Sequence, residues 1–363
     1  MKIAVLEHFT SCRPDRATRR LRAEGRAMRE AVVEDLCRLP DVMVTVLLRD
    51  RGALPECPRR LNLLVEGDRR RLFRQAVRWS DAVLLIAPEQ DCRLERLSRI
   101  VEEENRLLIG PSSRAVRLMA DKLLTARCLA AAGVSTPRCE IVSFRRAERL
   151  LARRTPPFVL KPRDGCGGEG VVLVRRRGQI AAAMRAVRRA TRRTDLLIQD
   201  YQPGVDASVS VLAGAARLLP MGLSRQRLAR RGALRYEGGE TPWPHPRGRQ
   251  ALRLACDAVE AVAERAPGVR GYLGVDLVLG ADGPSIIEIN PRLTVSYLGL
   301  RRVVSFNLPR AILEAARGGP VPDRVETLGR CRFRADGTAE LLARRGGSLR
   351  SWFTSAGTSA ASI

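Results

Sequence analysis

The 363-residue sequence predicts two kinds of architecture along one chain. Strand and helix signals alternate over residues 1–110, which predicts a parallel α/β sheet with helices on both faces. Beyond residue 110 the signals indicate paired strands with helices between them, which predicts an α+β region. Two hairpins carry most of the chemistry there: a glycine-rich one over residues 158–174, and one over residues 271–290 with acidic side chains in apolar strands. The chain is long enough for two or three domains with their own cores.

The first layer consists of short apolar runs separated by amphipathic segments. We expect strands at residues 2–6, 41–50, 81–89 and 107–109, and helices at residues 21–36, 69–79 and 94–104. No GxGxxG motif follows the first strand, so the layer is Rossmann-like but lacks the fingerprint of dinucleotide binding. An oxidoreductase is therefore disfavoured.

The second region begins at Pro111. Ser113 is expected to cap a helix over residues 114–132, which contains Lys122 and ends at Gly133. Residues 230–246, rich in Gly and Pro, are expected to form a long loop of the kind that often carries substrate contacts. The Ser/Gly/Ala-rich end, residues 346–363, is expected to be frayed. The other expected elements are helices at 179–193, 247–266 and 308–317, strands on either side of a Pro-Gly turn within 196–212, a strand at 218–228, and a hairpin turning at Asp282-Gly283.

The glycine-rich hairpin has the composition of a phosphate-binding loop. An apolar run ends in Lys161, and four glycines follow before the next apolar run: Gly165, Gly167, Gly168 and Gly170. Without a Cβ, their backbone N–H groups can fold closely over an anion, and Lys161 adds a compact positive charge. The alternative is a glycine-rich hairpin that happens to have a lysine beside it.

Composition narrows the class of protein. No apolar window is long enough for a membrane span, and the N-terminus resembles a first strand rather than a signal peptide. Nine cysteines without a CxxC pair and only two histidines make a zinc site improbable, and fit reduced thiols in a cytoplasm. The net charge of +26 suggests nucleic-acid binding, but arginine is spread over the whole chain and aromatic residues are only 4%. We interpret the charge as compositional, with nonspecific binding of anions or nucleic acid as a side effect.

Lysine usage is informative against this background. Of the 65 basic residues only Lys2, Lys122 and Lys161 are lysine, and two of these lie in the motifs discussed here. A lysine retained where arginine is otherwise used suggests a site that needs a compact ammonium, because the two cations are not interchangeable at a phosphate.

The second hairpin predicts a site for a hard metal ion. Glu288 and Asn290 are two residues apart, so they share a face of their strand, and Asp276 on the neighbouring strand can join them. Such oxygen ligands suit Mg²⁺, which is usually bound by few carboxylates together with phosphate oxygens. Arg292 could stabilise charge on a transferring phosphoryl group. The alternative is a polar strand face exposed to solvent, which the flanking isoleucines make less plausible.

Taken in order, four motifs resemble the ATP-grasp superfamily: ADKLLTA, VLKPRDGCGGEGV, IQDYQPGVD, and GVDLVLG followed by IIEINPR. The resemblance covers roughly residues 111–315 and implies that ATP lies between two α+β subdomains, after the Rossmann-like layer. We therefore expect a pre-ATP-grasp domain at 1–110, ATP-grasp subdomains at 111–196 and 197–325, and a C-terminal extension at 326–363.

The resemblance also implies roles for individual residues. Lys122 and Lys161 would contact the phosphates of ATP beneath the glycine loop, and Asp206 would bind the ribose hydroxyls, where the family more often has glutamate. The hinge at residues 199–202 would contact adenine through backbone groups. The implied nucleotide-binding set is Lys122, Lys161, Gly165, Gly167, Gly168, Gly170, Gln199, Asp200, Tyr201, Gln202 and Asp206, and the implied metal-binding set, for Mg²⁺ or alternatively Mn²⁺, is Asp276, Glu288 and Asn290.

The family's usual reaction activates a carboxylate as an acyl phosphate, which an amine then attacks to form an amide, with release of ADP. The resemblance therefore implies an ATP-dependent carboxylate–amine ligase in which Lys161 and Arg292 are the catalytic candidates. Such phosphoryl transfer depends on positioning and charge neutralisation, so the lack of a nucleophilic triad is no objection. A homodimer is a further possibility.

Short segments at the two ends resemble the tyramine–glutamate ligase branch of methanofuran biosynthesis: EHFT, LRAEG and INPRLTVSYLGLRR. This resemblance implies glutamate as the carboxylate and a primary aryl-ethylamine as the nucleophile. Candidate substrate contacts, each of which could equally pack a loop, are Arg225, Gln226, Tyr236, Glu240, Thr294 and Ser296. Two alternatives stay open: a ligase that uses an amino acid, peptide or other biosynthetic amine, and a basic nucleic-acid-binding protein with this fold and no ligase activity.

Overall fold

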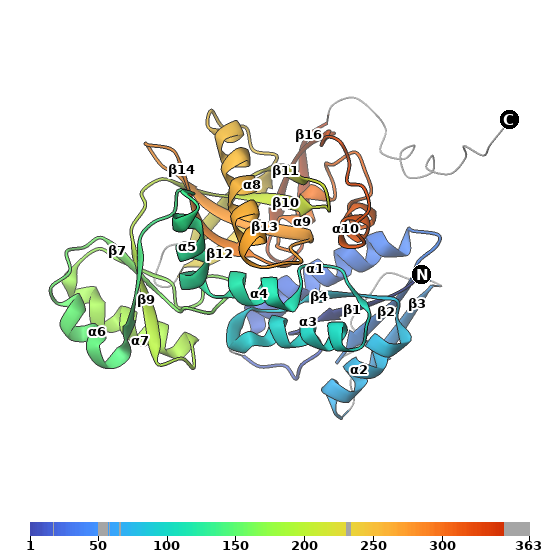
Figure 1. Ribbon diagram of the computed structural model, residues 1–363, viewed down its shortest axis with the longest axis horizontal. Coiled ribbons are helices and arrows are strands. Elements are labelled where there is room, and N and C mark those ends of the chain that lie inside the picture. The colour runs from blue at the N-terminus through green and yellow to red at the C-terminus, as the bar shows by residue number, and fades with distance from the viewer. Residues whose placement is uncertain (17, 50–56, 58, 65–66, 230–233, 345–363) are drawn as a thin grey trace.

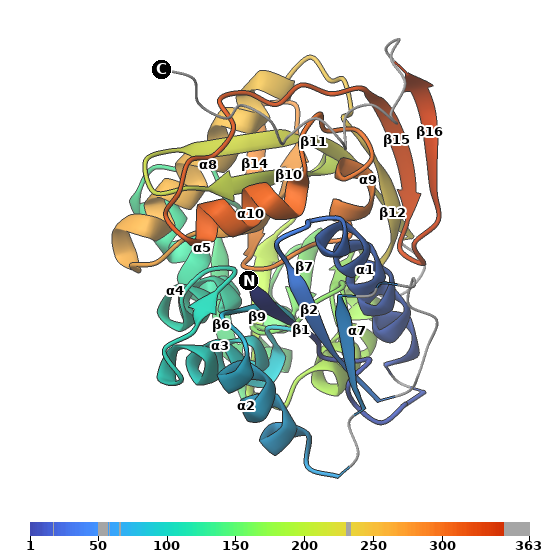
Figure 2. The ribbon, with the colours of Figure 1, turned by 90° about the vertical axis from the view of Figure 1, so that its right-hand side faces the viewer.

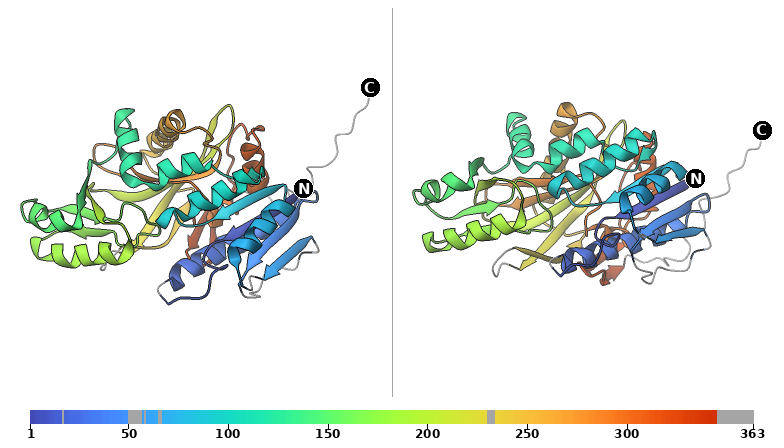
Figure 3. Two further views of the ribbon diagram at one scale, coloured as in Figure 1. Left: turned by 60° about the horizontal axis from the view of Figure 1, so that its bottom comes forward. Right: turned by 90° about the horizontal axis from the view of Figure 1, so that it is seen from below.

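The computed structural model describes residues 1–16, 18–49, 57, 59–64, 67–229 and 234–344. Its described strands form three sheets. The N-terminal sheet (blue) and the sheet that carries the glycine-rich hairpin (green) lie towards opposite ends of the molecule, as Figures 1 and 3 show. The predicted tail at 346–363 lies outside the described residues. No described helix is both long and apolar enough to cross a membrane.

The first sheet is parallel throughout, as predicted, with strand order β3-β2-β1-β4-β5. Alternate side chains of β1 face opposite sides: Ile3 and Val5 pack with α1, and Ala4 and Leu6 pack with α2 and α3. Both faces of the sheet are therefore buried. Its elements are β1 (Lys2–Glu7), α1 (Arg19–Cys37), β2 (Met43–Leu48), β3 (Arg60–Leu64), α2 (Arg69–Trp79), β4 (Ala82–Ile86), the short helix η1 (Gln90–Cys92), α3 (Arg93–Glu103) and β5 (Leu107–Leu108).

The second sheet is small and antiparallel, with order β6-β9-β7-β8. Helices α6 and α7 contribute to its core. The pairing of β7 with β8 confirms the predicted glycine-rich hairpin. Its elements are β6 (Cys139–Ser143), α6 (Phe144–Leu151), β7 (Phe158–Lys161), β8 (Val172–Val174), η2 (Arg177–Gln179), α7 (Ile180–Ala190) and β9 (Asp195–Asp200).

The third sheet has seven strands in the order β14-β13-β10-β11-β12-β15-β16. Helices α4, α5 and α8 pack with it in one core, while α1, α9 and α10 share a second core with it, so the N-terminal layer is attached to this sheet (Figure 2). Its elements are α4 (Ser113–Ala120), α5 (Lys122–Ala131), β10 (Val205–Ala213), β11 (Leu218–Ala229), β12 (Arg235–Thr241), α8 (Gly248–Arg265), β13 (Gly271–Leu279), β14 (Pro284–Asn290), α9 (Tyr297–Leu300), α10 (Leu308–Ala316), β15 (Gly329–Arg334) and β16 (Ala339–Arg344).

The single helix expected over residues 114–132 is wrong, because the chain forms α4 and α5 with a break at Asp121. Asp121 is extended (φ −96°, ψ 102°), and its side chain accepts hydrogen bonds from the backbone N–H groups of Leu123 and Leu124. It is therefore the N-cap of a new helix, and Lys122 stands in that helix's first position. The cap of α4 is Ser112 rather than Ser113.

The long loop expected over residues 230–246 is also partly wrong. Residues 235–241 form β12, which pairs with β11 and β15, and residues 230–233 lie outside the described part. Strands β3, β6, β12, β15 and β16 and helix α6 were not predicted from the sequence. The domain boundaries stay predictions.

Candidate functional site

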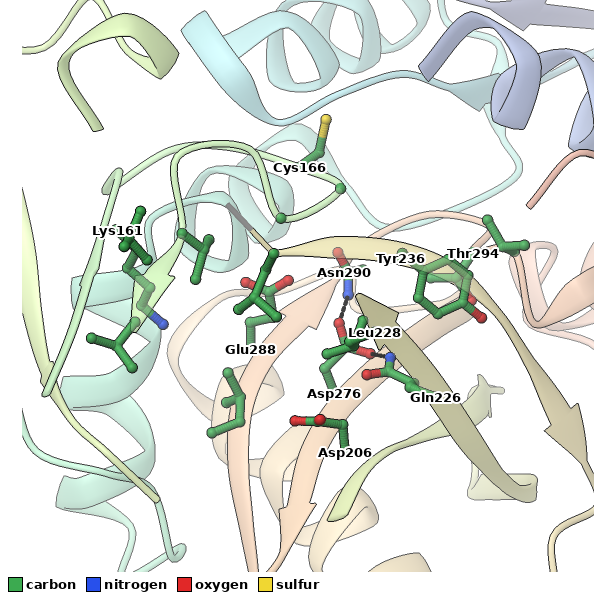
Figure 4. Close-up of a pocket in the computed structure, with 18 of the residues that line it drawn as sticks. Lys161, Cys166, Asp206, Gln226, Leu228, Tyr236, Asp276, Glu288, Asn290 and Thr294 are labelled. Carbon is green, nitrogen blue, oxygen red and sulfur yellow. Dashed lines mark hydrogen bonds between the residues drawn. The ribbon is translucent and has the colours of Figure 1, made fainter. Parts of the chain in front are cut away.

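A cavity of about 680 Å³ lies where the three sheets meet. One wall comes from the glycine-rich loop and the linker between β9 and β10. The opposite wall comes from β13 and β14, and α1 with the end of β1 closes the side next to the first sheet. Figure 4 shows the polar side chains that meet there. The arrangement brings together residues more than 200 positions apart.

The loop after β7 adopts a conformation that requires glycine at three positions. Gly167, Gly168 and Gly170 have φ values of 63°, 74° and 71°, a region that other residues rarely adopt. An added Cβ would lie 2.7 Å from Leu21 at Gly167, 2.8 Å from a backbone oxygen at Gly168, and 2.6 Å from Ala190 at Gly170. Gly167 and Gly168 line the cavity, whereas Gly165 and Gly170 shape the loop without lining it.

Two lysines lie near this loop, and they differ in whether their ammonium groups have partners. Lys122 Nζ lies 2.9 Å from Glu288 Oε2 and donates to the Gly165 carbonyl oxygen at 2.9 Å. Lys161 is only 2% exposed and lines the cavity; in the described part of the chain its Nζ has no hydrogen-bond or ion-pair partner. Burial lowers the pKa of Lys161. An unpaired ammonium buried in a cavity wall is suited to an anionic ligand.

The predicted metal-binding residues lie together on β13 and β14. Asp276 pairs with Glu288 across the strands, and its Oδ2 accepts from Asn290 Nδ2 at 3.0 Å. Gln226 Nε2 donates to the other oxygen of Asp276 at 2.7 Å, and Figure 4 shows both bonds. Burial, reinforced by the Glu288 carboxylate, raises the pKa of Asp276 to about 7. A cation placed between these carboxylates would relieve that repulsion.

Glu288 is held in its charged form by the lysines. Burial alone would raise its pKa, but Lys122 and Lys161 outweigh burial and lower it. Correspondingly, burial opposes the charge of Lys122, yet Glu288 outweighs it and raises the pKa of Lys122. No group of three or more His, Cys, Asp or Glu side chains among the described residues is placed to hold a metal ion. The donor set at this site is two carboxylates and one amide.

Arg292 follows β14 and lines the same cavity. Its Nε and Nη2 donate to the two carboxylate oxygens of Glu89 at 2.9 and 3.2 Å, and its Nη1 donates to the Leu293 carbonyl oxygen at 3.2 Å. Burial opposes the charge of Arg292, but Glu89 outweighs it and raises the arginine's pKa further. The guanidinium is therefore charged, and it is held by Glu89, a residue that follows β4 of the first sheet.

The linker after β9 lines the cavity as a continuous segment that comprises Gln199, Asp200, Tyr201 and Gln202. Asp206 on β10 lines it as well. The side chain of Gln199 donates to the thiol sulfur of Cys139 at 3.3 Å.

The six substrate candidates divide into two groups. Gln226, Tyr236, Thr294 and Ser296 line the cavity, although Gln226 is bonded to Asp276. Arg225 and Glu240 do not line it: they line a neighbouring hollow of about 460 Å³ beside β11 and β12. This hollow shares Asp206, Gln226 and Leu228 with the cavity, so Arg225 and Glu240 lie next to the cavity without lining it.

The first sheet contributes acidic residues that sequence reasoning missed. Glu7 is 1% exposed, and its carboxylate accepts from the backbone N–H groups of Phe9 at 3.0 Å and Thr10 at 2.6 Å. Glu24 is 7% exposed and pairs with Arg20 at 2.6 Å, and Arg20 also donates to the Gly167 carbonyl oxygen at 2.7 Å. Burial raises the pKa of both glutamates. Both lie in segments, EHFT and LRAEG, that were noted for their family resemblance, but no sequence pattern assigned a chemical role to either glutamate.

Comparison with known proteins identifies the fold. Residues 119–296 match the family model of the ATP-grasp domain, and residues 42–116 match that of the pre ATP-grasp 3 domain. An ATP-grasp superfamily protein from Archaeoglobus fulgidus superposes with a TM-score of 0.65 at 23% identity, with 92% of each chain covered. Biotin carboxylase from Campylobacter jejuni superposes at 0.68 with 18% identity, over 91% of this chain and 74% of that one. The chain thus has an ATP-grasp fold behind a Rossmann-like layer, as predicted.

Among curated proteins, the chain resembles tyramine–L-glutamate ligase from Methanocaldococcus jannaschii, with 30% identity over 223 residues. The match covers 61% of this chain and 58% of that protein, so the chain spans somewhat more than half of the relative's length. D-alanine–D-alanine ligase from Gloeobacter violaceus is 26% identical over 206 residues, which cover 52% of this chain and 65% of the relative.

Proposed function

We propose that this protein is an ATP-dependent carboxylate–amine ligase that forms ADP through an acyl-phosphate intermediate. One observation carries the proposal: the unpaired ammonium of Lys161, the glycine-rich loop and the acidic pair Asp276 and Glu288 all line one cavity. This combination supplies positive charge and free backbone donors for phosphates on one wall, and oxygen ligands for a cation on the other. The similarity to tyramine–L-glutamate ligase supports the same class of reaction.

The nucleotide would lie between the second and third sheets. Lys161 and the glycine loop would hold its phosphates, the backbone of residues 199–202 would contact the adenine, and Asp206 would contact the ribose. Asp276, Glu288 and Asn290 would hold Mg²⁺, an ion that supplies positive charge for phosphate oxygens. A solved relative, a biotin carboxylase domain from Hydrogenobacter thermophilus, is described as a complex with the magnesium salt of ADP.

The chain's own residues would act mainly by positioning and by charge. A substrate carboxylate oxygen would attack the γ-phosphorus as its bond to the ADP oxygen breaks, which yields an acyl phosphate and ADP. Lys161 and Arg292 would neutralise the charge that accumulates on the transferring group. The amine, bound as an ammonium ion, would first release one proton to solvent. Its nitrogen would then attack the acyl carbon as the bond from that carbon to the phosphate oxygen breaks, and the second proton would leave with the phosphate as HPO₄²⁻. Exclusion of water from the occupied cavity would protect the acyl phosphate from hydrolysis.

The end of the cavity next to the first sheet fits an amine substrate. Two carboxylates, Glu7 and Glu24, line it together with apolar side chains of Phe9, Leu21 and Met28. Carboxylates attract a protonated amine, and the apolar wall suits an aromatic or aliphatic body. L-glutamate and tyramine are accordingly the first substrate pair to test, because tyramine combines both features.

The test is ADP release from the purified protein with Mg·ATP and L-glutamate, with and without tyramine and a panel of amino acids and other amines. Release that needs both glutamate and tyramine, with the amide found by mass spectrometry, is the expected result. Release with another acid–amine pair would support ligase activity but would show that the substrates are not glutamate and tyramine. Tight Mg·ATP binding without turnover of any pair would count against the ligase.

A further inference from the structure

Glu89 occupies an unusual position behind the candidate site. It follows β4, at the carboxyl end of that strand, and is 4% exposed. Arg292 lines the cavity, whereas Glu89 does not, so Glu89 contacts the far side of the arginine. The two residues are 203 positions apart and connect the first sheet to the strand that carries Glu288 and Asn290.

The contact between them fixes the orientation of a guanidinium. Arginine has five N–H donors in one plane. Two of them, on Nε and Nη2, point to the carboxylate of Glu89, and a third, on Nη1, points to the carbonyl oxygen of Leu293. The remaining two N–H groups belong to Nη1 and Nη2, the end of a side chain that lines the cavity. A bidentate pair of this kind restricts rotation of the plane as well as supplying charge.

We infer that Glu89 is a positioning residue that holds the Arg292 guanidinium with two donors available to the transferring phosphoryl group. The inference rests on the proposed function and names a residue of that site which the sequence did not reveal. Glu89 touches neither substrate nor nucleotide in this account. It acts through Arg292. Because Glu89 belongs to the first layer and Arg292 follows a strand of the third sheet, the position of the guanidinium depends on how these two parts pack together.

A purely structural ion pair between the two parts would look similar in the fold, and the chain offers a matched control. Asp35 on α1 accepts from Arg301 Nε at 2.6 Å and from Tyr297 OH at 2.6 Å, so it joins the same two parts of the molecule. Asp35 is 5% exposed, and neither it nor its partners line the cavity. Removing either carboxylate therefore weakens a contact between the first layer and the third sheet. Only Glu89, however, contacts a residue that lines the cavity, Arg292.

The experiment compares Glu89→Gln, Glu89→Asp and Asp35→Asn with the wild type. Melting temperatures report the structural contribution. We expect both Glu89→Gln and Asp35→Asn to lower the melting temperature, while only Glu89→Gln lowers kcat for ADP release, by about tenfold or more, with the KM for Mg·ATP changed less than about threefold. Glu89→Asp, which keeps the charge, should retain more activity than Glu89→Gln; if the glutamine variant does not fold, the aspartate variant still compares with Asp35→Asn.

A binding measurement separates this inference from the proposed function. Aluminium fluoride added to Mg·ADP mimics the transferring phosphoryl group, so it should tighten nucleotide binding in the wild type and in Asp35→Asn, but at least about tenfold less in Glu89→Gln. Mg·ADP alone should bind all three within about twofold. If the wild type turns over no substrate pair yet this contrast holds, the ligase assignment fails and the positioning role stands. Equal losses in Glu89→Gln and Asp35→Asn would overturn the positioning role.

Discussion

The two buried lysines of the site are predicted to respond in opposite ways to the same substitution. Lys161 is an unpaired ammonium, so Lys161→Met replaces a buried charge with an apolar side chain of similar length. Lys122 is paired with Glu288 at 2.9 Å, and the two side chains are 9% and 22% exposed, so Lys122→Met removes the ion-pair partner of a partly buried carboxylate. The first change should stabilise the free protein, and the second should destabilise it.

The magnitudes follow from these contacts. Relief of an unsatisfied buried donor is worth about 1–3 kcal/mol, so Lys161→Met should raise the free energy of unfolding by roughly that amount. Breaking a fully buried ion pair from one side costs about 3–5 kcal/mol. Because Glu288 is 22% exposed, this range is the upper bound of the loss expected for Lys122→Met. Lys161→Met should nevertheless weaken Mg·ATP binding roughly 10- to 150-fold, because a hydrogen bond to a charged group contributes about 1.5–3 kcal/mol.

Urea denaturation of both variants without nucleotide gives the stabilities, and calorimetric titration with Mg·ATP gives the affinities. The distinctive result is a Lys161→Met protein that is more stable than the wild type and binds nucleotide more weakly. If Lys161→Met were destabilised by more than about 1 kcal/mol, the ammonium would have a partner in the free protein and the reasoning would fail. Unchanged nucleotide affinity would show that Lys161 does not contact the nucleotide.

Three further predictions concern residues in and around the site. Gly167→Ala should lower the melting temperature and weaken Mg·ATP binding, because Gly167 has φ +63° and an added Cβ would lie 2.7 Å from a leucine carbon; Gly178→Ala, with no atom within 4 Å, should do neither. His8→Asn should reduce acid sensitivity: burial, with two nearby arginines, lowers the pKa of His8 from 6.5 to about 3, so the unfolded state binds more protons and stability is lost as the pH falls below the unfolded pKa. Between pH 8 and pH 5.5 the wild type should lose about 1.4 kcal/mol more than the variant in urea titrations, and equal losses would refute this. Arg225→Ala should leave substrate KM values within about twofold, since Arg225 does not line the cavity, and a larger rise would show that Arg225 contacts a substrate.

The parts of the fold that were predictable are those in which local pattern and burial agree. Strands β1, β2 and β4 of the first sheet are mostly apolar runs, and the glycine-rich hairpin combines two such runs with glycines at positive φ in the loop between them. The strands β12, β15 and β16 were missed because their sequences are rich in Arg, Gly and Glu. They take their extended form from pairing along the edge of the third sheet, which local sequence does not encode.

The candidate site was predictable where one motif carries its own chemistry. Lys161, Asp276 and Glu288 interrupt apolar strands, so burial of a charge signals a function. The roles of Glu7, Glu24 and Glu89 depend on how the first sheet packs against the other two. That packing joins residues far apart in sequence, such as Glu89 and Arg292, which are 203 positions apart. Two substrate candidates, Arg225 and Glu240, line the neighbouring hollow rather than the cavity, and their role in substrate binding stays a prediction.

The central claim is that ATP activates a carboxylate by phosphorylation within this cavity. It is tested most directly by supplying L-glutamate labelled with ¹⁸O in its carboxyl groups, together with Mg·ATP and tyramine, and measuring the isotope in the released phosphate. An acyl-phosphate intermediate transfers one carboxyl oxygen to phosphorus, so the account predicts phosphate that carries one ¹⁸O for each amide formed. Unlabelled phosphate would show that the γ-phosphoryl group goes to water or another acceptor, and would contradict the account.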